Sequence, residues 1–237
     1  MIKQIKCAAV LMSFLWATAL QAQLQPTVTD GDGNVYQTIK IGDVVWMTEN
    51  LKTTTFNDGT SIPHITDNTE WASLATPGFS VQENDPDNKD TYGALYNWYA
   101  VQSGTLCPQG WRVATEEDWQ KLEIALGMSE DDAGSDTWRG TQGGQLAGHT
   151  EMWVKGALKS AADFGISGFH GLPAGNRLAD NGLFGNLGTN AYWWSASEHD
   201  ANSAWGRMLH YGTITIIKSA FDKNYGFCVR CVQDQSE

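Results

Sequence analysis

The stretch "YGFCVRCV", Tyr225 to Val232, decides the fold, because it places two cysteines in an extended segment near the end of the chain. Its aromatic and β-branched residues predict a strand. Because side chains alternate along a strand, one face carries Phe227, Val229 and Cys231, and the other carries Cys228, Arg230 and Val232. We expect the face with Phe and Val to be buried. Cys231 is then the cysteine that reaches a distant partner in the core.

The first residues have the pattern of a secretory signal. Residues 1–6 contain two lysines and no acid, residues 7–20 are apolar, and the small Ala22 offers a cleavage point before Gln23. The apolar run is shorter than the roughly 20 residues that span a bilayer, although an uncleaved membrane anchor is the alternative. Cys7 lies at the start of this run, whereas a lipid-anchored cysteine would lie at its end, so we expect a released rather than a lipid-anchored product. The sequence predicts a signal peptide over residues 1–22 and an exported protein, periplasmic, at the cell surface or extracellular.

Three cysteines remain in residues 23–237, namely Cys107, Cys228 and Cys231. Export places them in an oxidising compartment, where pairing is the usual fate. The face assignment predicts a Cys107–Cys231 disulfide and leaves Cys228 unpaired. The C-x-x-C spacing could also indicate a redox pair or half of a metal site. A redox pair normally opens a helix, and zinc requires a second ligand pair that the sequence lacks, so we predict no metal and no cofactor.

The charge of the chain excludes whole classes of partner. It has 27 acidic and 15 basic residues and a formal net charge of −12. Nucleic acids and anionic membrane surfaces are bound by basic patches, so we expect neither as a partner, and no membrane insertion after the signal is cleaved. The eleven tryptophans suggest sugar stacking, but most are expected to be core because indoles bury large areas. We expect a monomer.

Two local elements can be placed from the sequence. Val35–Ile41 alternates as a strand, Gly42-Asp43 fits a two-residue hairpin loop, and Val44–Met47 returns as the partner strand. In "CPQGWRVATEEDWQKLEIALG", Thr115 is a good N-cap residue with Asp118 at the third helical position. Trp119, Leu122 and Leu126 fall on one face at helical spacing, and Gly127 can end the helix. We predict a core-facing helix over residues 115–126.

The other segments are short and rich in turns. Asp30, Asp32 and Asn34 resemble the start of a calcium loop, but the required later Gly and Glu are missing, so we predict a turn and leave a divalent cation at Asp30 and Asp32 as an alternative. Residues 53–90 are polar and predicted to be surface loop. A short helix is expected at Gly143–Leu146. Residues 23–237 are predicted to form one α+β domain.

Six blocks in order carry a resemblance to a known family. They are "DGNVYQTIKIGDVVWMTENLKTTTFNDGTSIP", "YGALYNWYAV", "LCPQGWRVATEEDW", "SGFHGLPAGNR", "YWWSASE" and "YGFCVRCV". The chain resembles the Fibrobacter succinogenes major paralogous domain, abundant in exported proteins of Bacteroidota, from about Thr29 to Asp234. The resemblance implies a loop-rich C-type-lectin-like fold of two small, twisted, mainly antiparallel sheets with two helices. It also implies that Cys107 and Cys231 are the family's cysteine positions, and that Cys228 is a departure.

The stretch Ser197–Asp200 contains the residue types of a hydrolase triad, but adjacent residues on an extended chain point in opposite directions. We therefore predict a loop and no enzyme. The resemblance implies that the segment before the last strand displays ligand-binding side chains, for which we take His199, Asp200, Asn202, Arg207, His210 and Tyr211. The hypothesis is a secreted, non-catalytic module that binds a glycan or a surface protein. The alternatives are an oxidase of the formylglycine-generating type, with Cys228 and Cys231 holding copper, and a structural subunit of a surface assembly.

Overall fold

Short strands and short helices alternate along the computed structural model, which describes residues 23–234. The predicted signal peptide, residues 1–22, lies outside the described residues. The strands are β1 (Gln23–Thr29), β2 (Val35–Ile41), β3 (Val44–Met47), β4 (Phe79–Ser80), β5 (Leu95–Tyr96), β6 (Trp111–Val113), β7 (Thr137–Arg139), β8 (Ala174–Arg177), β9 (Phe184–Leu187), β10 (Asn190–Glu198), β11 (Ser203–His210), β12 (Ile216–Asp222) and β13 (Cys231–Gln233). The helices are α1 (Asn68–Ala72), α2 (Pro86–Tyr92), α3 (Trp98–Gln102), α4 (Glu116–Ala125), α5 (Glu130–Gly134) and α6 (Gly143–Leu146).

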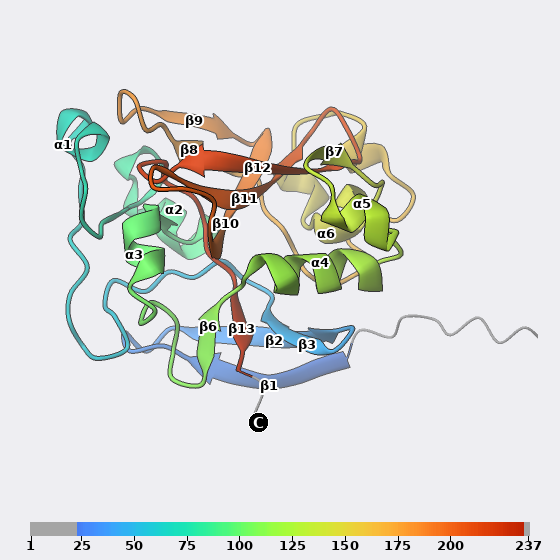
Figure 1. Cartoon of the computed structure of the whole chain (residues 1–237), viewed down its shortest axis with the longest axis horizontal. Helices are drawn as coiled ribbons and strands as arrows, with labels where there is room; N and C mark the ends of the chain where they lie inside the picture. Colours follow the sequence, from blue (N-terminus) through green and yellow to red (C-terminus); the bar gives the residue numbers. More distant parts are fainter. Residues whose placement is uncertain (1–22, 235–237) are drawn as a thin grey trace, which may run out of the picture.

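The first sheet has five strands in the order β1-β2-β3-β13-β6. The predicted hairpin is confirmed, because β2 and β3 pair antiparallel with Ile41 opposite Val44 across the Gly42-Asp43 turn. Strand β1, which the sequence did not predict, pairs with the outer side of β2 (Figure 1). The last strand, β13, enters between β3 and β6, so the two ends of the described chain meet in one sheet.

The second large sheet is antiparallel, with the order β10-β11-β12-β7, and two two-stranded sheets, β4-β5 and β8-β9, accompany it. Helix α4 lies between the two large sheets (Figure 1). Its Trp119 ring lies 5.1 Å from Trp46 of β3 and 6.0 Å from Trp193 of β10, measured between ring centroids. One buried indole therefore joins both sheets, as the predicted core-facing helix requires.

Helix α4 begins where the sequence predicted. The Thr115 hydroxyl accepts a hydrogen bond from the Asp118 amide, and the Asp118 carboxylate accepts one from the Thr115 amide, which is a complete capping box. Arg112 of β6 donates to the same carboxylate. Trp119, Leu122 and Leu126 are all buried. Local hydrogen bonds fix the start of this helix, and the buried face fixes its orientation.

The C-terminal segment "YGFCVRCV" confirms the predicted alternation but corrects the predicted burial. Phe227, Val229 and Cys231 pack in one hydrophobic cluster, while Cys228 and Val232 pack in a second one. Arg230 is also fully buried. The prediction that only one face would be buried was wrong, because the segment passes between two cores and both of its faces are covered.

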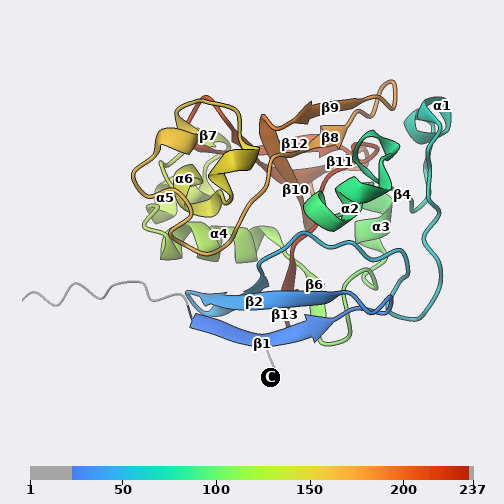
Figure 2. The same cartoon turned by 180° about the vertical axis from the view of Figure 1, so that it is seen from behind.

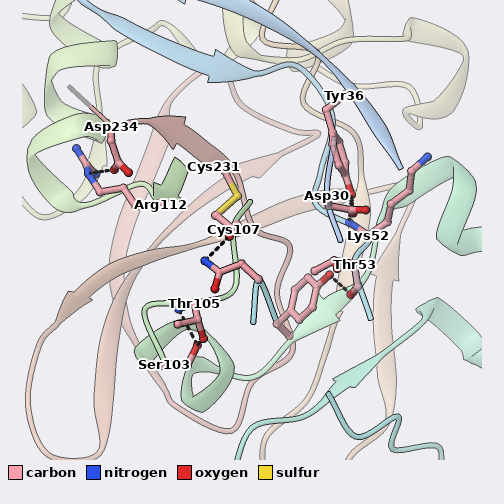
Figure 3. Close-up of a disulfide and its surroundings, with 12 residues drawn as sticks. Asp30, Tyr36, Lys52, Thr53, Ser103, Thr105, Cys107, Arg112, Cys231 and Asp234 are labelled. Atoms are coloured by element: carbon pink, nitrogen blue, oxygen red, sulfur yellow. Dashed lines mark hydrogen bonds and ion pairs between the residues drawn. A yellow bond between two sulfur atoms is a disulfide. The ribbon is translucent and has the colours of Figure 1, made fainter. Parts of the chain in front are cut away.

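The Cys107–Cys231 disulfide is confirmed (Figure 3). It joins residues 124 apart in sequence, with their Cα atoms 6.1 Å apart. Both cysteines are buried, and Cys228 is a free, buried thiol. The bridge ties β13 to the loop before β6, so it fastens the end of the chain to its middle.

The α+β class is confirmed, but the detail differs from the prediction of two sheets and two helices. Residues 23–234 contain four sheets and six short α-helices. The surface-loop prediction for residues 53–90 was wrong in part, because Ile65, Trp71 and Phe79 of this segment are buried. Asp67 and Asp85 cap helices α1 and α2 there, so polar residues that resemble loop sequence act as helix caps. Within residues 23–234, no helix has the length and apolar composition to cross a membrane.

Candidate functional site

The residues predicted to bind a ligand lie at the two ends of one strand, β11. His199, Asp200 and Asn202 form the turn before it, and His210 and Tyr211 lie where it ends. Eight extended residues span about 23 Å at the usual rise of a strand. The structure therefore separates the predicted set into two groups that cannot contact one small ligand together.

The turn before β11 is shaped by Asp200. Its carboxylate accepts hydrogen bonds of 2.8 Å from the amides of Asn202 and Ser203. The hydrogen bond from Asn202 is the main cause that lowers the pKa of Asp200 to about 2. These hydrogen bonds stabilise the turn, so they explain the position of the Asp200 side chain without a bound ligand.

The Ser, His and Asp side chains of this turn do not form a proton relay. His199 Nδ1 lies 3.1 Å from Asp200 Oδ2 and 2.9 Å from Ser203 Oγ, so one ring nitrogen faces both groups. A catalytic histidine uses one nitrogen for the carboxylate and the other for the nucleophile. The hydroxyl of Ser197 instead accepts a hydrogen bond from the amide of Glu116.

Arg207 is withdrawn from any exposed face. Its side chain is 1% exposed. The guanidinium donates to Glu123 at 2.7 Å and to both carboxylate oxygens of Glu116 at 2.7 and 3.0 Å. Position 207 shares the face of β11 that carries Leu209, and that face packs toward α4. Arg207 therefore joins β11 to α4 inside the protein and does not face a ligand as predicted, because strand alternation turns its side chain inward.

Two further basic side chains complete this buried cluster. Arg139 donates from Nη2 to both oxygens of Glu123 at 2.8 and 2.7 Å. Lys218 lies 3.0 Å from Asp136 and 3.5 Å from Glu116. Within the described part of the chain, Arg139 Nε and Nη1 have no hydrogen-bond partner. Three carboxylates balance three cations, so the cluster fastens β7, β11 and β12 to α4 without net charge.

Three neighbouring aromatic rings lie at the other end of β11, one of them exposed and two half-buried. We call Trp138, His210 and Tyr211 the aromatic surface. The Trp138 side chain is 56% exposed, and its ring lies 6.3 Å from that of His210, which lies 4.6 Å from that of Tyr211. Strand pairing sets Trp138 opposite Ile217 of β12. The ring of β7, the ring at the end of β11 and the ring of the residue that follows β11 therefore lie next to one another.

The backbone around the aromatic surface is held in place. The Tyr211 amide donates to Thr189, and the Tyr211 carbonyl accepts from Leu158. A Cβ atom on Gly156 would lie 2.2 Å from that carbonyl oxygen, so only glycine fits beside it. Thr137, next to Trp138, has a φ of 71°, a strained value for a β-branched residue. The rings are presented by a fixed frame rather than by a free loop.

His210 has a defined hydrogen-bonding state on this surface. Its Nδ1 accepts a 3.1 Å hydrogen bond from the Gly212 amide. A neutral imidazole that accepts at Nδ1 carries its proton at Nε2. The ring can therefore donate one hydrogen bond to a ligand beside the Trp138 indole. Trp138 was not among the residues predicted to bind a ligand, since its only signal in the sequence is one aromatic residue in the polar stretch "GSDTWRG".

A small cavity elsewhere is lined by His149 and His170, among others, and its volume is about 110 Å³. Partial burial, with the positive charges of Arg230 and His149, lowers the pKa of His170. A cavity of about 150 Å³ is known to accommodate benzene. The histidine cavity is smaller and cannot enclose a sugar ring, so it is a weaker candidate than the aromatic surface.

The acidic turn at the start of the chain is occupied by protein donors. Asp30 accepts hydrogen bonds from the amides of Asp32 and Asn34. It also accepts one from the Tyr36 hydroxyl, which Figure 3 shows. Asp32 accepts from Thr54. The turn prediction is confirmed. Within residues 23–234, no three His, Cys, Asp or Glu side chains are placed so that they could hold a metal ion.

The two late cysteines have separate surroundings. Cys231 is bonded to Cys107 and Cys228 lies in the other core, so they do not form a thiol pair. Burial raises the pKa of Cys228 to about 12. Between them, the Arg230 guanidinium donates to Asn50 Oδ1 and to the carbonyls of Met47, Phe169 and His170. These bonds connect three segments that are far apart in the sequence, namely residues 47–50, residues 169–170 and the strand segment that carries Arg230.

Comparison with known proteins gives one result. A family model described as the Fibrobacter succinogenes major domain matches residues 39–233. The searches of the curated proteins and of the solved structures found no match. The family match covers the second large sheet, the disulfide and the aromatic surface, and it covers the first sheet except β1 and the start of β2.

Proposed function

The chain belongs to the Fibrobacter succinogenes major domain family, and from that premise we propose that this member is an exported, non-catalytic recognition module that binds a glycan on its aromatic surface. The buried Cys107–Cys231 disulfide supports export, since such bonds persist in oxidising compartments. The fold that we propose for it is C-type-lectin-like. The final location is the periplasm, the cell surface or the exterior.

The exposure of Trp138 carries the proposal. Seven of the ten tryptophans in the described range are buried, two are half-buried, and Trp138 alone is exposed. An aromatic side chain can bury about 150–250 Å² and gains about 25 cal/mol for each Å² removed from water. Trp138 is 56% exposed, so a ligand that covers its indole would gain about 2–3 kcal/mol from the area removed from water. A flat ring with a neighbouring donor suits a sugar, whose apolar face stacks while its hydroxyls accept hydrogen bonds.

The size of the aromatic surface favours a glycan over a protein partner. A stable protein interface buries about 800 Å² on each partner, which is far more than three side chains provide. The formal net charge of −12 supports a partner other than nucleic acid, which is bound by basic patches. No observation favours the copper oxidase, because Cys231 is held in the disulfide and Cys228 is buried.

The test is a glycan array probed with wild-type protein and with two matched variants. Trp138→Ala removes the exposed indole, and Ile166→Ala removes an apolar side chain that is 71% exposed outside the three rings. We expect Trp138→Ala to lose at least tenfold in affinity for any glycan hit, as for an aromatic hot spot, and Ile166→Ala to lose nothing. Equal binding by both variants would contradict the assignment. An array without hits, combined with envelope proteins that co-purify with wild type but not with Trp138→Ala, would replace the glycan with a protein and make the chain a subunit of an assembly.

A further inference from the structure

A second cavity is lined in part by residues of β4 and α2. These two elements lie toward the opposite end of the molecule from β7 (Figure 2). The volume of this cavity is about 200 Å³. The residues that line it come from the loop after β3, from β4 and the segments on either side of it, and from α2. They are Thr54, His64, Phe79, Val81, Asn84, Pro86 and Lys89.

The interior of this cavity is apolar and partly flat. Phe79 and Val81 are buried residues that contribute to its lining. The His64 ring stacks on Phe79, with the ring centroids 4.8 Å apart and the planes 13° apart. Partial burial, together with the positive charges of Arg177 and Lys89, lowers the pKa of His64, which favours its neutral imidazole. A planar, uncharged ligand ring would find a stacked pair of rings and aliphatic contacts here.

The charge of the lining is positive, against the sign of the whole chain. Lys89 is its one charged group at pH 7, and no carboxylate lines the cavity. Among residues 23–234, the Lys89 ammonium makes no ion pair or hydrogen bond, whereas the neighbouring Asp32 is already bonded to Thr54 and Thr55. Partial burial tends to raise the pKa of Asp32, but those hydrogen bonds and the positive charge of Lys89 lower it overall. An anionic ligand group would therefore find an unpaired cation at the edge of an apolar cavity.

The backbone segment before α2, which carries part of the lining, is held in place by hydrogen bonds. Glu83 and Asn84 both have a positive φ, at 57° and 55°, which are strained values for residues other than glycine. The Asn84 side chain donates to the Thr66 carbonyl at 3.1 Å, and Asn88 donates to Gln82 at 3.0 Å. These bonds hold the segment before α2, so the cavity exists before any ligand enters, which reduces the entropic cost of binding.

We infer that this cavity binds a small carboxylate that carries a planar ring, with the ring against His64 and Phe79 and the carboxylate at the Lys89 ammonium. A cavity of about 150 Å³ accommodates benzene, so 200 Å³ holds a six-membered ring with a short attachment. Two sources share this chemistry: a free aromatic acid, and the C-terminal aromatic residue of a peptide. This site is separate from the aromatic surface and does not depend on the glycan proposal.

The experiment is a titration of the full chain with four probes, followed by calorimetry and by the amide NMR signals of Thr54 and Asn84. The probes are phenylacetate, N-acetylphenylalanine, its neutral amide and acetate. We expect both ring acids to bind and to shift these signals, the amide to bind about fivefold more weakly, and acetate not to bind. The tighter of the two acids identifies the source, a free acid or a peptide terminus.

Two variants test the assigned contacts. Lys89→Met keeps the apolar stem and removes the charge, so it should weaken both acids about fivefold and leave the amide unchanged. Lys155→Met, at an exposed lysine outside the cavity lining, is the matched control and should bind as wild type does. His64→Ala should weaken every ring ligand. Equal affinity for acid and amide, full binding by Lys89→Met, or no binding of any ring ligand would each overturn the inference, and unchanged spectra elsewhere in the protein confirm that the variants are folded.

Discussion

Removing the Cys107–Cys231 disulfide is expected to cost much of the stability of the fold. The bond joins residues 124 apart in sequence. The chain-entropy relation gives about 5 kcal/mol for closing a loop of this length, because the cross-link removes conformations from the unfolded chain. Domains of this kind are stable by about 5–15 kcal/mol in total, so the double variant Cys107→Ala/Cys231→Ala should be close to unfolding at 37 °C.

Urea unfolding followed by tryptophan fluorescence measures the effect, in protein produced without residues 1–22. The double variant should unfold at a lower midpoint, and its dependence on urea should be steeper, because an unlinked unfolded chain exposes more surface. Cys228→Ala is the control, since this buried thiol closes no loop and its removal should cost only about 1 kcal/mol. The entropic reasoning fails if the double variant is within about 1 kcal/mol of this control.

Four further outcomes follow from the structure. Arg230→Met should lower the free energy of unfolding by about 3–5 kcal/mol, because it leaves buried acceptors unpaired. In thermal melts, Arg230→Lys should not restore the wild-type melting temperature, because lysine cannot reproduce the fork of guanidinium donors. Asp118→Asn should cost about 1–2 kcal/mol at pH 7 through the lost cap. Burial raises the pKa of Asp118, but hydrogen bonds from Arg112 lower it overall. The ionised Asp118 therefore stabilises the fold above its unfolded pKa of about 4, and this stabilisation is lost as the pH falls through the folded pKa. The melting temperature should consequently fall less steeply between pH 7 and pH 3 in Asp118→Asn than in the wild type. The Cys228 thiol should react with a thiol reagent only after unfolding, since it is buried with a pKa raised to about 12, and rapid labelling of folded protein would contradict this burial. Trp138→Ala should change the free energy of unfolding by less than about 0.5 kcal/mol, and a larger loss would mean that the indole is structural.

The sequence was most informative where a few neighbouring residues decide the conformation. The Gly42-Asp43 turn fixed the register of β2 and β3, and the reciprocal bonds of Thr115 and Asp118 fixed the start of α4. These features depend on hydrogen bonds and backbone angles within a few residues. Strand alternation likewise placed Cys228 and Cys231 on opposite faces, because the direction of a side chain on a strand is a local property. The choice of Cys231 as the partner of Cys107 was correct, but it rested on the expectation of a single buried face, which the structure corrects.

The candidate site could be predicted only in part. His210 and Tyr211 were identified, but Trp138 was missed and Arg207 proved to be buried. Strand pairing between β7 and β12 brings Trp138 beside β11, and no pattern within five residues of Trp138 encodes that pairing.

The sequence by itself determined the direction in which each side chain leaves its strand or helix. Only the tertiary structure decided what each side chain contacts. Cys228 packs in a second core, Arg207 binds carboxylates of α4, and Trp138 is exposed to solvent. The physical reason is that near neighbours in the chain set the backbone geometry, whereas packing against segments far away in the sequence sets the burial of a side chain.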